Sequence, residues 1–163
     1  MNASKYRQGV AEMYQGELLG EALFSRAASL ARTDDQRFKL CVLLQLETET
    51  KARLRPLVAR LGLNLVEDEA VRAEGLRLGS EIGSLPWADF LQMLERELNG
   101  YVARYQAIAD LAPAADRPVV QSMVDHELAL LAFTRVELAE HGSLRSLDPI
   151  NALLVNPMRC PAV

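Results

Sequence analysis

The sequence predicts an all-α fold, a bundle of four long helices, and three observations support this prediction. Apolar residues recur every three or four positions in four long segments, and no segment alternates with the period of two typical of strands. Short connections join the first segment to the second and the third to the fourth, so each pair should form an antiparallel hairpin. Residues 63–85 form a longer crossover between the hairpins. We expect one domain over residues 1–163.

The first hairpin is predicted from two helices joined by a few residues. The first covers residues 4–31, with Ser4 as a suitable N-cap. The second begins at Thr33, where "TDDQ" fits a capping box, and it ends at Gly62, a residue type that commonly stops helices. Pro56 lies inside this second helix and should bend it, because proline removes a backbone hydrogen bond.

The second hairpin is predicted from a third and a fourth long helix. The third begins at Ser84, with Pro86 in its first turn, and runs to about Leu111. The fourth begins near Asp116 and stops at Gly142.

Two shorter helices are expected outside the hairpins. One lies in the crossover at residues 67–78. The other is a short apolar turn around residues 150–155, in the C-terminal tail 143–163, and it should pack across the end of the bundle.

Composition excludes several classes of partner. The net charge is −4 and no run of five like charges occurs, so nothing suggests a nucleic acid partner. The N-terminus lacks the apolar run of a signal peptide, and no 18-residue apolar stretch predicts a membrane span. The two cysteines form neither a disulfide framework nor a metal knuckle. A cytoplasmic location, with no membrane partner, is the resulting expectation.

A glutamate recurs at matching places in the two predicted hairpins. The stretch "MYQGELLGEALF" (13–24) and the stretch "MLERELNGYVAR" (93–104) share Met, Glu, Leu and Gly at identical spacing. The hairpins align without a gap when Glu17 is placed on Glu97, and Glu47 then falls on Glu127. We interpret this as an internal repeat, which predicts two related halves.

These four glutamates lie mid-helix, on or beside the stripe that should face the core. A lone buried carboxylate costs several kcal/mol and would take up a proton instead. Converging carboxylates need positive partners, and two divalent cations would balance four of them. In each hairpin a glycine follows the glutamate of the first helix by about one turn: Gly20 follows Glu17, and Gly100 follows Glu97. These glycines leave room for ions or substrate, or else they permit close helix packing.

A different stripe assignment is also open for the third helix. Leu94, Leu98 and Tyr101 define a competing stripe, and on it Glu95 and Glu97 only flank the core. If the assignment is one position off, some of the four glutamates face solvent.

The four glutamates carry a resemblance to a known family. One Glu on the first and third helices, with Glu-x-x-His on the second and fourth, is the ligand set of ferritin-like di-iron carboxylate proteins. The matching residues are Glu17, Glu47 in "ETET", Glu97 and Glu127 in "ELAL". The chain thus resembles ferritin-like proteins of the rubrerythrin type over about residues 4–142. The resemblance implies a ferritin-like four-helix bundle with Fe or Mn at these glutamates.

The sequence departs from that family at both histidines. Thr50 and Leu130 occupy their positions, and His126 should point about 100° away from its neighbour Glu127, so we expect it to be structural. Without imidazole the site would be all-oxygen and favour Mn²⁺, Mg²⁺ or Fe²⁺ over Zn²⁺. Thr50 is placed to donate a hydrogen bond to a ligand or a water molecule.

Two hypotheses about function follow, and whether the protein is an enzyme stays open between them. In the first, the glutamates hold divalent metal, and the protein retains chemistry of the di-iron type, such as ferroxidase, peroxide-reducing or oxygenase activity. In the second, the bundle has lost the metal and serves as a non-enzymatic interaction or small-molecule-binding module. The retained carboxylates favour the first hypothesis, and the missing histidines favour the second.

A homodimer is also predicted, because apolar residues lie off the inner stripe of the first hairpin. Burying them against a second copy would stabilise a dimer by about 25 cal/mol per Å² before association costs. The residues of this predicted seam are Leu19, Leu23, Leu30, Phe38, Cys41 and Gln45.

Overall fold

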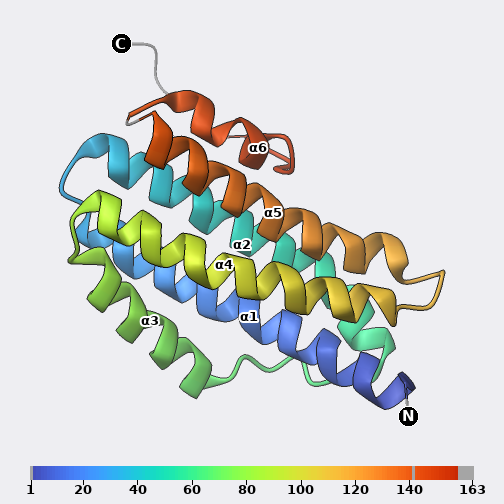
Figure 1. Ribbon diagram of the computed structural model, residues 1–163. Helices are drawn as coiled ribbons and strands as arrows, with labels where there is room; N and C mark the ends of the chain where they lie inside the picture. Colours follow the sequence, from blue (N-terminus) through green and yellow to red (C-terminus); the bar gives the residue numbers. More distant parts are fainter. Residues whose placement is uncertain (1, 141, 158–163) are drawn as a thin grey trace.

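The computed structural model describes residues 2–140 and 142–157, and its regular elements there are all helices, with no strand. This confirms the all-α class. The elements in chain order are α1 (Asn2–Leu30), α2 (Asp34–Arg60), α3 (Glu69–Gly83), α4 (Trp87–Asp110), α5 (Arg117–Ala139), the 3-10 helix η1 (Leu144–Leu147) and α6 (Asp148–Asn151). Figure 1 shows α1, α2, α4 and α5 running along one common direction.

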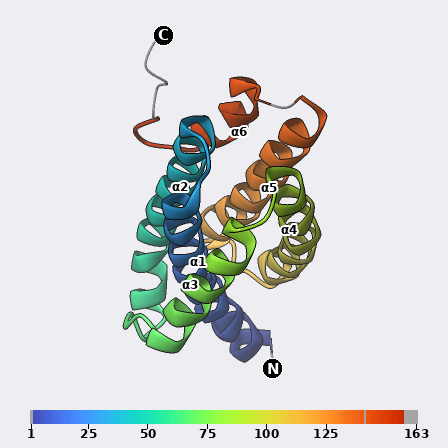
Figure 2. The same ribbon diagram turned by 90° about the vertical axis from the view of Figure 1, so that its left-hand side faces the viewer.

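The long helices pack as two pairs, α1 with α2 and α4 with α5, and the pairs lie against each other (Figure 2). Gly9 and Gly16 of α1 approach Ile108 and Tyr105 of α4 in reverse chain order, so these two helices are antiparallel. α2 and α5 also contact each other across the interior.

Helix α3 lies along α1 through glycines spaced by one helical turn. A Cβ atom at Gly75 would lie 2.5 Å from the carbonyl oxygen of Leu19, and one at Gly79 would lie 2.5 Å from that of Leu23. The two helices therefore run parallel with their backbones nearly touching. The predicted crossover helix, 67–78, ends too early, since α3 continues to Gly83. Glycine has a low helix propensity, but close packing on α1 offsets that cost here.

Residues predicted to form a dimer seam are covered by other parts of the chain. α3 lies over Leu19 and Leu23 on α1. On α2, the Gln45 side chain donates a 2.7 Å hydrogen bond to the carbonyl oxygen of Asn156, beyond α6. Part of the surface invoked for a homodimer is therefore used within one chain, and the structure gives that prediction no support.

Several helix boundaries follow the predicted signals. The Thr33 hydroxyl accepts a 3.1 Å hydrogen bond from the backbone N–H of Gln36, as the capping box requires. Gly62 and Gly142 have φ values of 63° and 81°, the left-handed conformation that ends helices. The predicted start of the third long helix was wrong, because Ser84 caps the end of α3 and α4 begins at Trp87.

The buried interior consists of two apolar clusters with a polar layer between them. One cluster contains Phe24, Leu46 and Leu98, and the other contains Met13 and Tyr105, among others. Between them along the helices lie buried polar residues: Glu17, Glu47, Thr50, His126 and Glu127. This arrangement places the predicted carboxylates in the middle of the fold.

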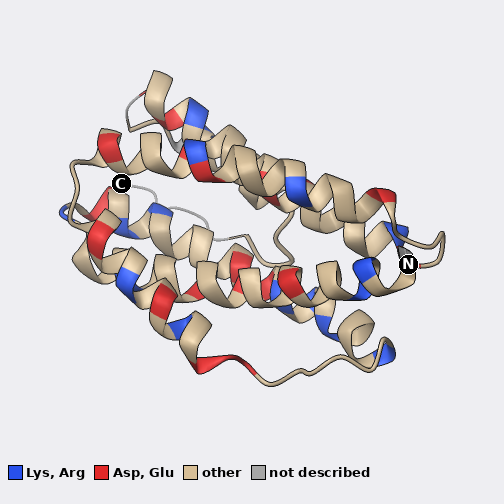
Figure 3. Cartoon of the chain, turned by 60° about the horizontal axis from the view of Figure 1, so that its bottom comes forward, with Lys and Arg blue, Asp and Glu red and all other residues tan. Residues whose placement is uncertain are grey.

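The outer surface carries both signs of charge. Figure 3 shows Lys and Arg interspersed with Asp and Glu along the helices in that view. Within the described residues, no helix is both long enough and apolar enough to cross a membrane.

Candidate metal centre

Three helices bring two carboxylates and an imidazole together in the polar layer. Glu17 comes from α1, Glu47 from α2 and His126 from α5, and their relative exposures are 1%, 3% and 1%. One ligand atom from each residue lies within 4.8 Å of the other two. The Nδ1 atom of His126 is 3.6 Å from Oε2 of Glu17, and its Nε2 atom is 3.4 Å from Oε1 of Glu47.

Thr50, three residues after Glu47 on α2, lies against the imidazole of His126. Its Oγ1 atom lies 3.0 Å from Nδ1 of His126, within hydrogen-bond distance. With Nδ1 assigned as the donor to Thr50, Nε2 is the ring nitrogen that faces Glu47, 3.4 Å from its Oε1. Among the described residues, neither Nε2 of His126 nor Oε2 of Glu17 has a hydrogen-bond partner. Buried polar atoms without partners are rare, and they indicate an unfilled binding requirement.

Glu127 is the fourth acidic member of the layer. It is 5% exposed and comes from α5, directly after His126. Burial raises the pKa of Glu127 to about 7; the nearby His126 opposes this shift and the Glu47 carboxylate adds to it. Its side chain makes no hydrogen bond or ion pair with the rest of the described chain.

The pKa values of Glu17 and His126 are also shifted in this layer. Burial raises the pKa of Glu17 well above its usual value, with His126 opposing and Glu47 adding to the shift. Burial alone would lower the pKa of His126, but the carboxylates of Glu17 and Glu47 outweigh it and raise that pKa to about 10. Without metal, the layer is therefore neutralised by an imidazolium and by protonated carboxyl groups.

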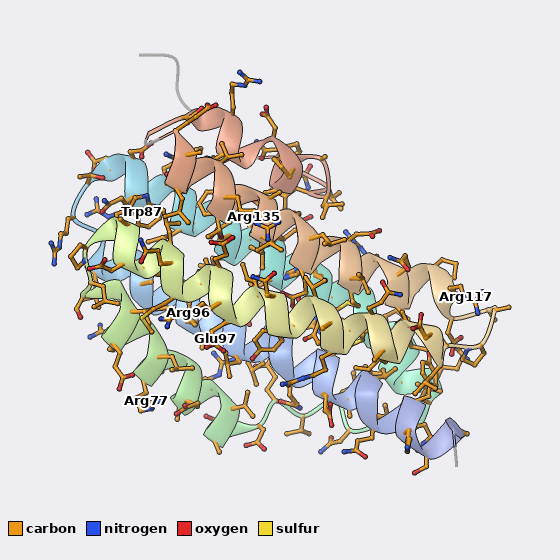
Figure 4. All side chains as sticks on the ribbon, viewed as in Figure 1. Arg77, Trp87, Arg96, Glu97, Arg117 and Arg135 are labelled. Carbon is orange, nitrogen blue, oxygen red and sulfur yellow. The ribbon has the colours of Figure 1, made fainter. Side chains whose placement is uncertain are left out.

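Glu97 does not join the other three glutamates. It is exposed, whereas Leu94, Leu98 and Tyr105 are buried on α4. The competing stripe is therefore the one that faces the core, and Glu95 pairs at 2.9 Å with Arg135 at the surface. Figure 4 shows Glu97 at the side of α4 that borders α1.

The two glycines of the predicted repeat also have different surroundings. A Cβ atom at Gly20 would lie 2.5 Å from Cδ of Glu47, so the missing side chain makes room for that carboxylate. A Cβ atom at Gly100 would meet nothing within 4 Å. At these positions the two halves differ, and the repeat stays a prediction from the sequence.

His126 is the site residue that the sequence argument misjudged. The expected angle of about 100° from Glu127 does not keep His126 out of the site, because α5 is packed on several sides, by α2, α4, η1 and α6, and the imidazole lies near Glu17 and Glu47. Both His126 and Glu127 are therefore buried. A usable signal was present, since His126 follows Met123 by three positions and precedes Leu130 by four, which is core spacing.

A cavity of about 260 Å³ borders the polar layer. Glu47 and Glu127 form part of its wall, together with Tyr105 and the backbone of Gly16 and Gly20. The Tyr105 hydroxyl lies against Gly16, where a side chain of any size would collide with it. Burial raises the pKa of Tyr105 well above its usual value, and the carboxylates add to this shift, so its hydroxyl keeps its proton.

A second buried charge cluster lies nearer the end of the molecule where α4 begins. Lys39 of α2 and Glu137 of α5 are both 0% exposed and form a 2.8 Å ion pair. Lys39 also binds Asp35 at 2.8 Å, and Nε1 of Trp87 donates a 3.0 Å hydrogen bond to Glu137. This cluster holds α2, α5 and the start of α4 together.

Compared with models of known protein families, with curated proteins and with solved structures, the chain gives no significant match. The resemblance to ferritin-like proteins therefore stays a prediction from the sequence.

Proposed function

We propose that the protein is a ferritin-like four-helix bundle that binds one divalent transition-metal ion, Fe²⁺ or Mn²⁺, in its core. Glu17, Glu47 and His126 would hold the ion, and Glu127 would lie beside it. The observation that carries this proposal is the convergence of three ligand atoms within 4.8 Å in a buried layer. Two of the ligand groups contain atoms without hydrogen-bond partners there, Glu17 Oε2 and His126 Nε2.

The spacing of the His126 and Glu47 donors suits two ligands of a single ion. Bonds from carboxylate oxygen or imidazole nitrogen to such metals are about 2.0–2.2 Å long, so two ligands of one ion lie roughly 3–4.4 Å apart. The 3.4 Å between His126 Nε2 and Glu47 Oε1 falls in this range. Thr50 supports the arrangement, because metal-binding histidines usually donate their second N–H to a fixed acceptor.

The donor set also indicates which metal and which chemistry. Two carboxylates and one imidazole, without thiolate, suit Fe²⁺ or Mn²⁺. Bound iron would supply redox chemistry with oxygen or peroxide. The chain's own contribution is to exclude bulk water, to hold Nε2 of His126 toward Glu47, and to keep a protonated Tyr105 hydroxyl at the cavity wall.

One observation favours the alternative of a non-enzymatic bundle without metal. The pKa of His126, raised to about 10, gives the layer a permanent positive charge at neutral pH. An imidazolium between Glu17 and Glu47 can therefore neutralise part of the acidic charge that a metal would otherwise balance. In this case the layer would be structural and the cavity would be the functional feature.

A metal titration distinguishes the metal-binding function from the metal-free alternative. Chelator-treated protein is titrated with Mn²⁺, and with Fe²⁺ under anaerobic conditions, while bound metal per chain and the melting temperature are measured. At 100 times the dissociation constant a ligand stabilises the fold by about 2.7 kcal/mol, which raises the melting temperature by roughly 5–10 °C. We expect one ion per chain, loss of binding in Glu47→Gln and His126→Gln, and no loss in the exposed control Glu97→Gln. Absence of binding in the parent protein favours the metal-free alternative.

A further inference from the structure

The cavity beside the polar layer has an apolar body and an acidic end. Leucine, isoleucine, methionine and phenylalanine side chains from α1, α3 and α4 form most of its wall. Glu47 and Glu127 close it on the side of the polar layer, and Tyr101 and Tyr105 lie on the same wall. Within the described residues, no lysine, arginine or histidine borders this space.

The acidic end contains acceptors that the protein leaves unused. Glu127 is 95% buried, borders the cavity, and forms no hydrogen bond or ion pair within the described chain. The Tyr105 hydroxyl, also at the wall, has no hydrogen-bond partner among the described residues. A buried carboxylate without a partner is costly, so a ligand that supplies donors and positive charge would be stabilised there.

We propose that this cavity binds a small organic amine, with its protonated amino group at Glu127 and its apolar body among the leucines. An ammonium group has three donors and no acceptor, which matches an end made of carboxylates and a tyrosine hydroxyl. Tyr101 also lines the cavity, and one face of its ring is covered by Arg104, whose Cζ atom lies 5.4 Å from the ring centroid. An anionic ligand would be repelled by Glu47 and Glu127, and a neutral one would bring no positive charge to Glu127.

The size of the cavity limits the amine. A dry apolar cavity of about 150 Å³ accepts benzene, so the 260 Å³ available here can hold one aromatic ring with a short aminoalkyl arm. Glu97 also borders the cavity and is exposed, so it places a negative charge where a cation would enter. In Figure 4 this side chain lies beside the seam between α4 and α1.

The amine site does not require the metal. Glu17 and His126 are absent from the cavity wall, so the groups proposed to hold the ion lie behind Glu47. If an ion is bound, its two charges balance Glu17 and Glu47 and leave Glu127 for the amine. Without an ion, the amine supplies positive charge to the same layer from the cavity side.

A set of three ligands of one shape tests the proposal. Benzylamine, benzyl alcohol and benzoate are titrated by calorimetry into the chelator-treated full chain. We expect benzylamine to bind at least tenfold more tightly than benzyl alcohol, and benzoate not to bind. Equal binding of the amine and the alcohol would overturn the proposal, and so would tighter binding of benzoate. This comparison uses only the parent protein, so it does not depend on whether a variant folds.

Three variants then locate the bound amine. Glu127→Gln should reduce benzylamine affinity at least tenfold while leaving benzyl alcohol affinity within about twofold. Glu95→Gln should change neither, because Glu95 of α4 is half-buried, pairs with Arg135 and lies outside the cavity wall. Met93→Trp adds bulk to the cavity wall and should remove binding of both ligands. If Glu127→Gln keeps the preference for the amine, or Met93→Trp binds benzylamine like the parent, the amine lies elsewhere and the assignment is wrong.

Discussion

Thr50 occupies the position where the ferritin-like pattern has a histidine, and its hydroxyl lies 3.0 Å from Nδ1 of the one buried histidine described, His126. The imidazole therefore enters the carboxylate layer from α5, one residue before Glu127, and α2 supplies its hydrogen-bond partner. If the layer holds a metal as proposed, the one imidazole ligand comes from α5, and α2 supplies its hydrogen-bond partner instead of a second imidazole.

Replacing Thr50 should weaken metal binding without unfolding the protein. Thr50→Val keeps the side-chain shape and removes the acceptor for Nδ1 of His126, so the imidazole loses its fixed orientation. Loss of such a partner typically costs 10–100-fold in metal affinity. Mn²⁺ titration monitored by electron paramagnetic resonance measures this, and Thr50→Ser is the matched control that retains the hydroxyl. Equal affinity in Thr50→Val would show that Thr50 does not orient a ligand.

The metal-free protein should lose stability as the pH rises from about 5 to 10. Glu127 has a pKa near 4.5 when unfolded and about 7 when folded, so its contribution is full below pH 4.5 and is lost as the pH passes 7. His126 has a pKa of 6.5 when unfolded and about 10 when folded, so its contribution is full below pH 6.5 and is lost toward pH 10. Both signs agree, and the raised pKa of Glu17 acts in the same direction.

Melting temperatures of chelator-treated protein at pH 6 and pH 9 measure this dependence. We expect the value at pH 9 to be lower by several degrees, and Glu127→Gln to flatten the profile while Glu95→Gln does not. Mn²⁺ affinity should change in the opposite direction and increase with pH, because the metal requires deprotonated ligands. A flat profile in the parent protein would show that the layer is hydrated rather than buried.

Alanine at the two glycines of the repeat should have opposite effects. In Gly20→Ala the new methyl group collides with the Glu47 carboxyl, and overpacking of this kind costs about 1–3 kcal/mol. In Gly100→Ala the methyl group meets open space, so the higher helix propensity of alanine should stabilise the protein by up to about 1 kcal/mol. Urea unfolding of both variants gives the comparison. A Gly20→Ala protein as stable as Gly100→Ala would mean that Glu47 does not lie against α1.

Breaking the buried ion pair at Lys39 should destabilise the fold strongly. Removal of one partner of a buried pair costs about 3–5 kcal/mol, because the other charge stays in a dry environment. Lys39→Ala should therefore lower the free energy of unfolding by that amount. The control is Arg37→Ala, whose pair with Asp34 is exposed and should contribute less than about 1 kcal/mol. Similar losses in both variants would show that solvent reaches Lys39.

The sequence predicted most of the helices because their signals are local. The capping box at Thr33 and the glycine stops at Gly62 and Gly142 depend on a few adjacent residues, and all three are confirmed. The extent of α3 was underestimated because its glycines are favourable only against the backbone of α1. A contact between segments that are distant in the sequence decides where α3 ends, and local helix propensity carries no information about such a contact.

The candidate site was predicted in part for the same reason. Glu17, Glu47 and Glu127 each lie on a helix whose core stripe is clear, and all three are buried. On α4 the sequence allowed two assignments of the buried face. Leu98 and Tyr105 are buried in the structure, and Glu97 is exposed. The periodicity of one helix cannot tell how many neighbours cover it, so the burial of His126 by several elements was not foreseen.

The polar layer between the two apolar clusters also restricts how the helix pairs can slide past each other. If the α4–α5 pair moved by one turn along α1 and α2, His126 and Glu127 would lie among leucines, and Glu17 and Glu47 would lose their positive neighbour. An unpaired buried charge costs far more than imperfect apolar packing. Leucine-rich clusters alone tolerate several such alignments, so it is the charged layer that restricts the two helix pairs to a single alignment.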